Sequence, residues 1–233
     1  MRTFAGIASL PGRPLEQTLR SLRGQVDEIG VYLNGYPAVP AYVRDLGCHV
    51  VLCRGNAGAA AKLSWAAQWD GLYFACDDDL VYPPDYVATL RAEWERWGPG
   101  VIVTACGRAL RPEARSWGDW LGPARYIDAV PAARWVNYFG AGAFLHHTAL
   151  PLPLPVEPAN EDDAVLAVWA QRAGVPIRLV ARPYDWPTRI PLPPGAFTLY
   201  EHAARERFAS RTRIIRQVSP WTVHVPVTEE VAV

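Results

Sequence analysis

The stretch Leu72–Asp79 reads Leu-Tyr-Phe-Ala-Cys-Asp-Asp-Asp, a short apolar run that ends directly in three carboxylates. Five consecutive apolar residues without alternation are typical of a strand that is buried on both faces of a sheet. In open sheets of parallel strands, ligands bind at the carboxyl ends of the strands. The stretch therefore predicts a buried strand of an α/β fold that delivers Asp77, Asp78 and Asp79 to a ligand-binding edge.

Other apolar runs lie on both sides of this stretch and are separated by segments with helical spacing. Leu15, Leu19 and Leu22, for example, recur at the spacing of one helical face. Continuous apolar strands that are each followed by a helix favour a mostly parallel sheet flanked by helices. The predicted strands are Thr3–Leu10, Glu28–Leu33, Cys48–Cys53, Val101–Ala105, Ala141–His146 and Ile177–Val180, and the predicted helices are Pro14–Arg23, Ala59–Trp69, Pro84–Trp97, Glu161–Ala173 and Phe197–Arg216.

The composition is that of a globular protein with a sizeable core. Of the 233 residues, 50% are hydrophobic and 20% are charged, which excludes collagen-like, coiled-coil and disordered classes. The 23 basic residues balance the 23 acidic ones, so bulk charge does not indicate a broad nucleic-acid-binding surface. No apolar run approaches the roughly 18 residues of a membrane helix. We therefore expect one domain over residues 1–233.

The four cysteines form no C-x-x-C pair, so a zinc site is not indicated. All four lie in or beside apolar runs, which favours free thiols in a reducing cytosol. The apolar start of the chain is short and fits a first strand better than a signal peptide. We therefore expect a cytoplasmic protein.

The three adjacent aspartates at 77–79 indicate a divalent cation. Neighbouring carboxylates repel one another unless a positive charge offsets them. Mg²⁺ and Mn²⁺ prefer oxygen ligands and commonly share a phosphate-bearing substrate. The alternative is that one aspartate caps the following helix while the others face water.

A second group of carboxylates, Glu161-Asp162-Asp163, opens a predicted helix. On that helix Asp163 shares a face with Leu166 and Ala170, which turns it toward a cleft. A carboxylate at a cleft can act as a general base. The alternative is that acidic residues in a first turn simply stabilise the helix macrodipole.

Six short motifs follow one another between about residues 3 and 182, and their order and spacing resemble those of a family 2 glycosyltransferase of the GT-A fold. That fold is α/β, with a Rossmann-like, mostly parallel central sheet flanked by helices in a single domain. The D-x-D element of the family is matched by Asp77–Asp79, and its E-D-x-x-L element by Asp162–Leu166. The other motifs are Gly6–Arg13, Val31–Tyr36, Gly55–Lys62 and Gly140–Phe144.

The resemblance implies transfer of a sugar, with inversion, from a nucleoside diphosphate to an acceptor hydroxyl. Residues of about 1–106 would form the nucleotide-sugar-binding half, and residues of about 107–233 the acceptor-binding half with a C-terminal basic helix or lid. The implied cofactor is Mn²⁺ or Mg²⁺, and a UDP- or GDP-sugar is the expected donor. The acceptor stays open among glycans, lipid-linked sugars, proteins and small molecules, and a modified DNA base is conceivable.

The resemblance also implies roles for individual residues. Asp79 would bind the metal together with Asp77. Asp163 would deprotonate the acceptor hydroxyl, and Asp162 is the alternative base because it replaces the more usual glutamate. The implied donor-binding residues are Ser9, Pro11, Arg13, Asn34, Lys62, Asp77 and Asp78.

Further side chains carry two interpretations each. Lys62, the only lysine, either contacts the nucleotide (or its phosphates) or is a solvated helix residue. His202 is a late metal ligand in a lid, or a surface histidine. Trp117, Trp120, Trp135 and Trp186 pack in the core or rim, or stack on an acceptor sugar. A basic run near the C-terminus either binds phosphates, DNA or a membrane surface, or is a solvated helix face. Binding to a membrane surface would attach the protein peripherally. The run consists of Arg205, Arg207, Arg211, Arg213 and Arg216.

Two other classes compete with the transferase. A nucleotidyltransferase on a related α/β sheet would need a basic, glycine-rich signature near the N-terminus, and Leu10–Arg13 is too poor in glycine and charge for that. A non-catalytic nucleotide- or sugar-binding module would bind the donor without hydrolysis or transfer.

Overall fold

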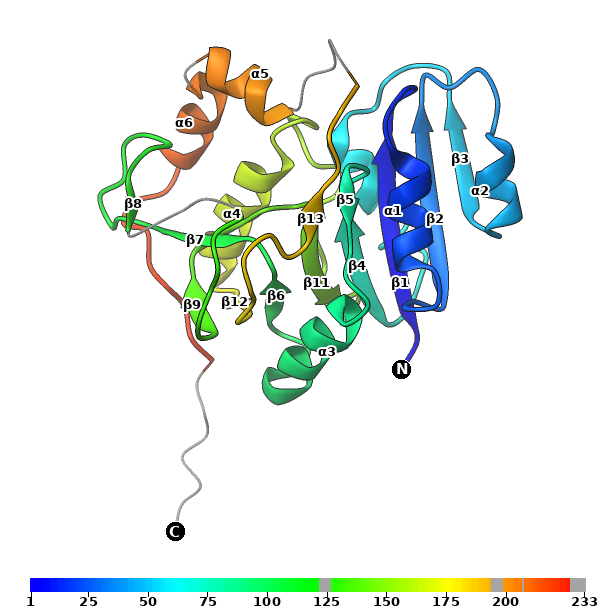
Figure 1. Cartoon of the computed structure of the whole chain (residues 1–233). Helices are drawn as coiled ribbons and strands as arrows, with labels where there is room; N and C mark the ends of the chain where they lie inside the picture. Colours follow the sequence, from blue (N-terminus) through cyan, green and yellow to red (C-terminus); the bar gives the residue numbers. More distant parts are fainter. Residues whose placement is uncertain (122–126, 194–198, 207, 227–233) are drawn as a thin grey trace.

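The computed structural model describes residues 1–121, 127–193, 199–206 and 208–226. Its centre is an eight-stranded sheet with the order β3-β2-β1-β4-β11-β6-β12-β9, flanked by helices (Figure 1). These strands are β1 (Thr3–Ser9), β2 (Glu28–Asn34), β3 (His49–Cys53), β4 (Leu72–Cys76), β6 (Ile102–Thr104), β9 (Arg134–Val136), β11 (Ala143–His147) and β12 (Ile177–Leu179).

Helices and small strands complete the fold. The helices are α1 (Leu15–Leu22), α2 (Ala41–Asp45), the 3₁₀ helix η1 (Ala59–Leu63), α3 (Tyr86–Trp97), α4 (Asp162–Ala173), α5 (Leu199–Arg205) and α6 (Ala209–Ile215). A three-stranded sheet joins β7 (Gly107–Leu110) to β8 (Trp120–Leu121) and β10 (Tyr138–Phe139), and β5 (Leu80–Val81) pairs with β13 (Thr188–Arg189).

The sheet is mostly parallel, as the apolar pattern predicts. β11 is antiparallel to both β4 and β6, so those two run in the same direction, and six of the eight strands point one way. β11 and β9 run against them. The antiparallel course of β11 places Ala143 opposite Cys76, so the start of β11 meets the end of β4. This pairing brings the loop around Gly142 to the aspartates that follow β4.

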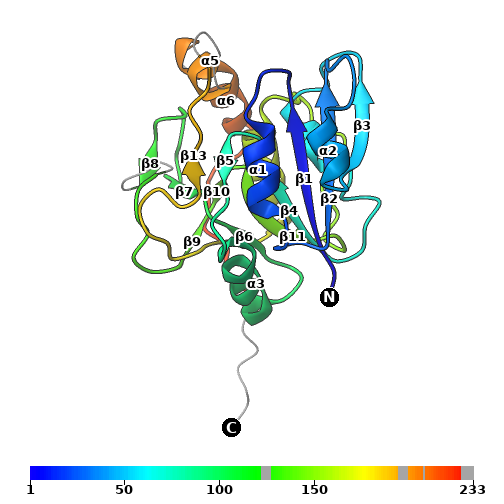
Figure 2. The same ribbon diagram turned by 45° about the vertical axis from the view of Figure 1, so that its right-hand side comes forward.

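The core lies on both faces of the sheet, which explains the continuous apolar run of β4. Leu72, Phe74 and Cys76 pack with α1 and α3 in one cluster, whereas Tyr73 and Ala75 pack with η1 and α4 in another. Figure 2 shows α1 beside β1. Each β4 side chain in these clusters is completely buried, so neither face of the strand has room for a polar residue.

The prediction of an α-helix over Ala59–Trp69 is wrong in both the type and the length of the helix. It is a 3₁₀ helix that ends at Leu63 and continues as turns. The Tyr73 hydroxyl donates to the Lys62 carbonyl, and the Ala60 N–H donates to the Ala159 carbonyl. These backbone groups are therefore bonded across the fold rather than along an α-helix.

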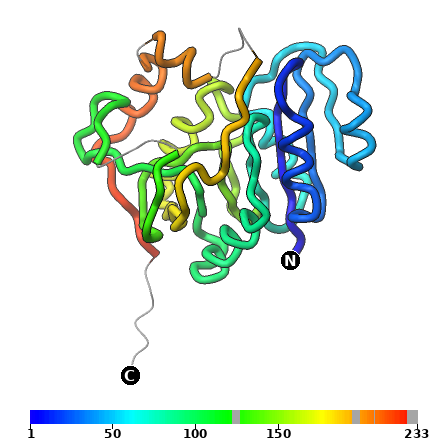
Figure 3. Tube along the Cα trace, in the orientation of Figure 1, coloured from blue at the N-terminus to red at the C-terminus, as the bar shows by residue number. Residues whose placement is uncertain are grey.

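The prediction of a single helix over Phe197–Arg216 is also wrong, because the described part of this segment forms two helices, α5 and α6. Phe208, between them, has φ of 54°, a left-handed conformation that ends a helix. Phe197 and Arg207 lie outside the described residues. Both helices lie at the end of the molecule toward which β1 and β2 point, opposite the N-terminus (Figure 3).

The four cysteines are free, as expected. Among the described residues, no helix is both long enough and apolar enough to cross a membrane.

Candidate functional site

A pocket of about 290 Å³ opens where the strands β1, β2 and β4 end. Its walls come from both halves of the chain, because residues after β4 face the first turn of α4 across it. Nine of the eleven residues singled out in the sequence line this pocket, and Pro11 and His202 do not. The nine are Ser9, Arg13, Asn34, Lys62, Asp77, Asp78, Asp79, Asp162 and Asp163.

Two of these residues shape the wall at the ends of β1 and β2. Asn34 is 2% exposed, its amide donates to the Gly58 carbonyl over 3.3 Å, and its Oδ1 accepts from the Ala57 N–H at 2.9 Å. The Ser9 hydroxyl lies 3.2 Å from the Tyr36 hydroxyl. Asn34 therefore braces the glycine-rich loop after β3.

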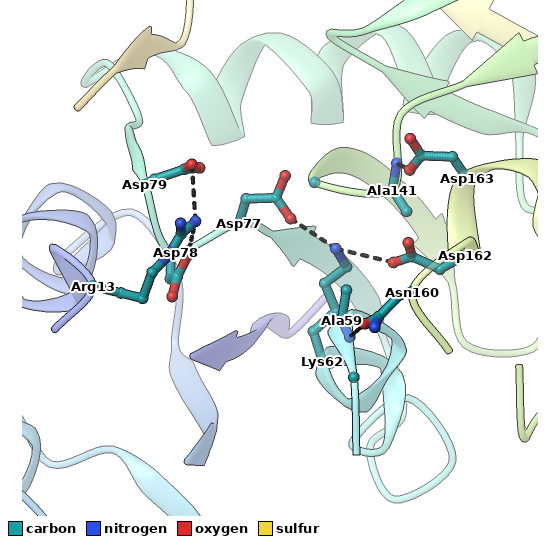
Figure 4. A network of polar contacts seen from close by, with 12 residues as sticks. Arg13, Ala59, Lys62, Asp77, Asp78, Asp79, Ala141, Asn160, Asp162 and Asp163 are labelled. Atoms are coloured by element: carbon teal, nitrogen blue, oxygen red, sulfur yellow. Dashed lines mark hydrogen bonds and ion pairs between the residues drawn. The ribbon is translucent and has the colours of Figure 1, made fainter. Parts of the chain in front are cut away.

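The aspartates after β4 are held by an arginine that the sequence did not pair with them (Figure 4). Arg13 donates through Nε and Nη2 to Asp78 Oδ1 at 3.0 and 2.8 Å, and through Nη2 to Asp79 Oδ2 at 2.9 Å. Burial, followed by the negative charge of Asp77, raises the pKa of Asp79 to about 6 although Arg13 opposes the shift. Arg13 therefore offsets part of the repulsion within the cluster.

Lys62 is the only lysine and is 3% exposed, so the interpretation as a solvated helix residue is wrong. Its Nζ donates to Asp77 Oδ1 at 2.7 Å and lies 3.1 Å from Asp162 Oδ2, an ion pair without hydrogen-bond geometry (Figure 4). Burial alone would lower the pKa of Lys62, but the charges of Asp162 and Asp77 raise it. The ammonium thus stays charged and joins the two walls of the pocket.

The two aspartates that open α4 have different surroundings. Asp162 is 4% exposed and faces Lys62, and burial raises its pKa to about 6 although Lys62 opposes the shift. Asp163 is half-buried, and its Oδ1 accepts the Ala141 N–H at 2.6 Å. Its Oδ2 forms no hydrogen bond with the residues that the structure describes. Of the pair, Asp163 therefore has the carboxylate oxygen available to a ligand.

The wall beside Asp163 contains side chains that the sequence did not bring together: Arg108, Trp117, Tyr138 and Arg211. Trp117 is the one of the four tryptophans considered above that lines the pocket. Trp135 packs against Trp97, and Trp186 donates its indole N–H to Asp85. The cross-strand pair of Arg108 with Tyr138 could have been found only from strand pairing, because 29 residues separate them in the sequence.

Two implied roles gain no geometric support. The His202 side chain is 69% exposed on α5, 3.6 Å from Glu206, and Pro11 is exposed at the tip of the turn after β1. The C-terminal basic run is not a uniform solvated face, since Arg211 is buried against Glu161 and lines the pocket.

The donor set at the aspartates fits a hard divalent cation that is shared with a phosphate. No group of three His, Cys, Asp or Glu side chains is arranged to hold a metal ion within the described part of the chain. Mg²⁺ does not require such a cage, because it is commonly held by one or two carboxylates together with substrate phosphates and waters. Asp77, whose side chain is 45% exposed, and Asp79 both line the pocket and can supply those carboxylates.

Comparisons with known proteins support the fold alone. No family model and no curated protein matches the sequence. Among solved structures, 166 chains are similar. One, described as "Crystal Structure of a Mycobacterial Protein", has a TM-score of 0.57 and 19% identity and covers 92% of this chain and 74% of its own. The likeness shows that the arrangement of helices and strands recurs in a mycobacterial protein.

Proposed function

We propose that the protein is an inverting glycosyltransferase of the GT-A type that moves a sugar from a nucleoside diphosphate to an acceptor hydroxyl. The observation that carries the proposal is that Asp77–Asp79 and Asp163 line one pocket from opposite walls. One wall follows a strand of a mostly parallel sheet, where nucleotides commonly bind. The other presents a carboxylate with a free oxygen, which suits a general base.

The donor is proposed to lie in the half of the pocket formed by residues of about 1–106. Ser9, Arg13 and Asn34 line that half and would contact the nucleotide. Asp77 and Asp79 would hold a divalent cation, which when bound neutralises charge on the departing diphosphate. Lys62 and Arg13 keep the aspartates in place before the donor arrives.

The chemical step assigned to this chain is a proton transfer. Asp163 Oδ2 takes the proton from the acceptor hydroxyl, while the Ala141 N–H fixes Oδ1 and so orients the carboxylate. The hydroxyl oxygen forms the new bond to the anomeric carbon. The bond from that carbon to the diphosphate oxygen breaks, and its electron pair leaves with the nucleoside diphosphate. Attack from the face opposite the leaving group inverts the anomeric configuration.

Asp162 is proposed to act through Lys62 rather than on the substrate. Its carboxylate is buried and directed at the Lys62 ammonium, which also bonds Asp77. It is therefore a positioning residue that ties the donor-side aspartates to the start of α4.

Binding and turnover test the proposal separately. Thermal unfolding is measured with UDP, GDP and their sugar conjugates, each with and without Mn²⁺. A ligand at 100 times its dissociation constant adds about 2.7 kcal/mol, which shifts the melting temperature visibly. We expect a Mn²⁺-dependent shift with one base. No shift with any nucleotide in a folded sample would contradict the donor site.

Release of nucleoside diphosphate from the bound donor then tests the base. Asp163→Asn should retain nucleotide binding and lose about 10²–10⁴-fold in turnover. Asp45→Asn, an exposed aspartate on α2, is the matched control and should leave turnover unchanged. Unchanged turnover in Asp163→Asn, with the donor bound, would favour a binding module. Loss of turnover in Asp162→Asn but not in Asp163→Asn would assign the general base to Asp162. Release of pyrophosphate from a nucleoside triphosphate and a sugar phosphate would instead indicate a nucleotidyltransferase.

A further inference from the structure

Beside Asp163, the pocket is lined by two arginines and two aromatic rings, which come from β7, β10, α6 and the loop between β7 and β8. Arg108 on β7 and Tyr138 on β10 are direct antiparallel partners, so their side chains lie on the same face of the small sheet. Arg211 on α6 and Trp117 complete the wall, and all four line the pocket together with Asp163. Figure 1 shows β7, α4 and α6 in the same part of the molecule, away from β1–β3.

The hydroxyl of Tyr138 is the first sign of a ligand at this wall. Tyr138 is 3% exposed, and its hydroxyl forms no hydrogen bond with any described residue. A buried hydroxyl without a partner is costly, and such groups are uncommon in folded proteins. Burial, followed by the charge of Asp163, raises the pKa of Tyr138 well above its ordinary value, so the group remains a donor. Because the residue lines the pocket, a bound acceptor atom can satisfy it.

The two guanidinium groups have unused donors as well. Arg108 lies over Trp120, with 4.9 Å from its central carbon to the ring centroid, and over Trp117 at 5.7 Å. Stacking engages the face of a guanidinium but leaves the N–H groups at its edge free. Within the described ranges Arg108 forms no ion pair.

Arg211 is held from two sides. Its central carbon lies 4.9 Å from the Trp117 ring, and its Nε donates to Glu161 Oε2 at 2.8 Å. The two Nη groups form no hydrogen bond or ion pair with a described residue. Burial alone would lower the pKa of Arg211, but the negative charge of Asp163 outweighs it and raises that pKa. Trp117 therefore lies against both arginines and fixes their positions at the pocket wall.

We propose that Arg108, Arg211 and the Tyr138 hydroxyl form a subsite for a carboxylate or phosphate group carried by the acceptor. The inference rests on the proposed glycosyl transfer, because it places that anionic group beside the hydroxyl that Asp163 deprotonates. Fixed guanidinium edges bind carboxylate and phosphate in two parallel hydrogen bonds, which gives orientation as well as affinity. The acceptor is thereby a hydroxyl compound with a negative charge near the reacting hydroxyl.

The donor diphosphate is the other anion that could meet these arginines. The donor-side aspartates already pair with Arg13, on the donor side of the pocket, and with Lys62, which joins the two walls, whereas Arg108 and Tyr138 share the wall beside Asp163. This separation favours the acceptor as the source of the anion, and the experiment below distinguishes the two.

Isothermal titration measures binding of glycerol, D-glycerate and glycerol 3-phosphate to the whole protein, with and without saturating UDP and Mn²⁺. In the wild type we expect the two anions to bind at least about tenfold more tightly than glycerol, since hydrogen bonds to a charged group are stronger than those to a neutral one. Arg108→Gln should remove this preference and leave the UDP affinity within about twofold. Arg91→Gln, on the exposed face of α3, is the control and should change neither.

Tyr138→Phe provides a second variant whose folding is not in question. It removes an unpartnered buried hydroxyl, so we expect an unchanged or higher melting temperature together with weaker anion binding. Equal binding of glycerol and the anions in the wild type, or an Arg108→Gln protein that keeps the preference, would overturn the subsite. A tenfold loss of UDP affinity in Arg108→Gln would assign the arginine to the donor and also overturn it. Anion binding by a protein that binds neither UDP nor GDP in the presence of Mn²⁺ would retain the subsite and refute the glycosyltransferase instead.

Discussion

Replacing Lys62 by methionine tests whether the buried ammonium holds the two walls of the pocket together. Methionine has a similar length and no charge, so it leaves little cavity and removes only the positive charge. Lys62 is 3% exposed and has two carboxylate neighbours, Asp77 and Asp162. Breaking a buried ion pair by removing one partner costs about 3–5 kcal/mol.

The two carboxylates contribute unequally to that cost. Asp77 has a 45% exposed side chain and regains water when the lysine is lost, whereas Asp162 is 4% exposed and cannot. The penalty therefore comes mainly from Asp162, and we expect a loss near the lower limit, about 3 kcal/mol. For a chain of this length, that lowers the melting temperature by about 6–12 °C.

The dependence on pH follows from the pKa of Asp162. In the folded protein this pKa is about 6, mainly because of burial, and it exceeds the value of about 3.9 in the unfolded chain. A carboxyl group with a raised folded pKa stabilises the fold most below the unfolded pKa, and this contribution is lost as pH rises through the folded pKa. Without Lys62 the pKa of Asp162 rises further. The deficit of the variant should therefore be small at pH 5 and much larger at pH 8.

Urea unfolding of the wild type, Lys62→Met, Asp162→Asn and the double variant at both pH values measures these differences. The double variant should recover about 2 kcal/mol relative to Lys62→Met at pH 8, because the uncompensated buried charge is gone. An equal deficit at pH 5 and pH 8, or no recovery in the double variant, would refute the reasoning.

Two further substitutions test the geometry of the pocket and the packing of α6. Gly142→Ala would place a Cβ 1.8 Å from Asp77 Oδ2, which the flexible side chain can avoid only by turning, so we expect at least a tenfold loss of Mn²⁺-dependent nucleotide affinity with little change in melting temperature. Gly100→Ala, where a Cβ meets nothing within 4 Å, is the control in the same titration. Trp221→Ala should destabilise the protein by about 3–5 kcal/mol in urea unfolding, because Trp221 is 2% exposed and its indole N–H caps the Ile215 carbonyl at the end of α6. A loss below 1 kcal/mol would show that the end of α6 does not depend on this contact.

Seven of the eight strands of the central sheet were predictable because each lies in a local apolar run, whereas β9, which reads Arg-Trp-Val, and the short strands of the two small sheets were not predicted. Among the predictable strands β4 is the clearest example, since burial on both faces requires an apolar residue at every position from Leu72 to Cys76. The direction of β11 was not predictable, because an apolar run in a two-sided sheet is the same for a parallel and an antiparallel neighbour. The 3₁₀ helix η1 was also not predicted, because its conformation depends on a contact outside the segment itself. Its alanines favour a helix locally, and a hydrogen bond from the distant Tyr73 hydroxyl overrides that preference.

The candidate site was predictable only where its chemistry lies in consecutive residues. Asp77–Asp79 and Asp162-Asp163 were evident as groups of carboxylates, but their sequence does not show which of them is buried. That difference arises from the turn of α4, which directs Asp162 at Lys62 and Asp163 at the pocket. Arg13, which holds Asp78 and Asp79, lies 65 residues before Asp78, and Ala141 lies 22 residues before Asp163, so neither partner is evident from the carboxylate groups themselves.

The balance of charges in the pocket explains how such a site can exist before any ligand arrives. Among the described residues, five aspartates line it, and so do five cationic side chains: Arg13, Lys62, Arg108, Arg189 and Arg211. Because the total is neutral, the pocket as a whole exerts little long-range attraction on a nucleotide or an anionic acceptor. Binding must then depend on short-range geometry, with Arg13 and Lys62 committed to aspartates and the edges of Arg108 and Arg211 left open. A donor that brings its own cation meets carboxylates on one wall, and an acceptor that brings an anion meets guanidinium groups on the other. This placement of carboxylates and guanidinium groups on different walls keeps the two substrates apart and sets the acceptor hydroxyl beside Asp163.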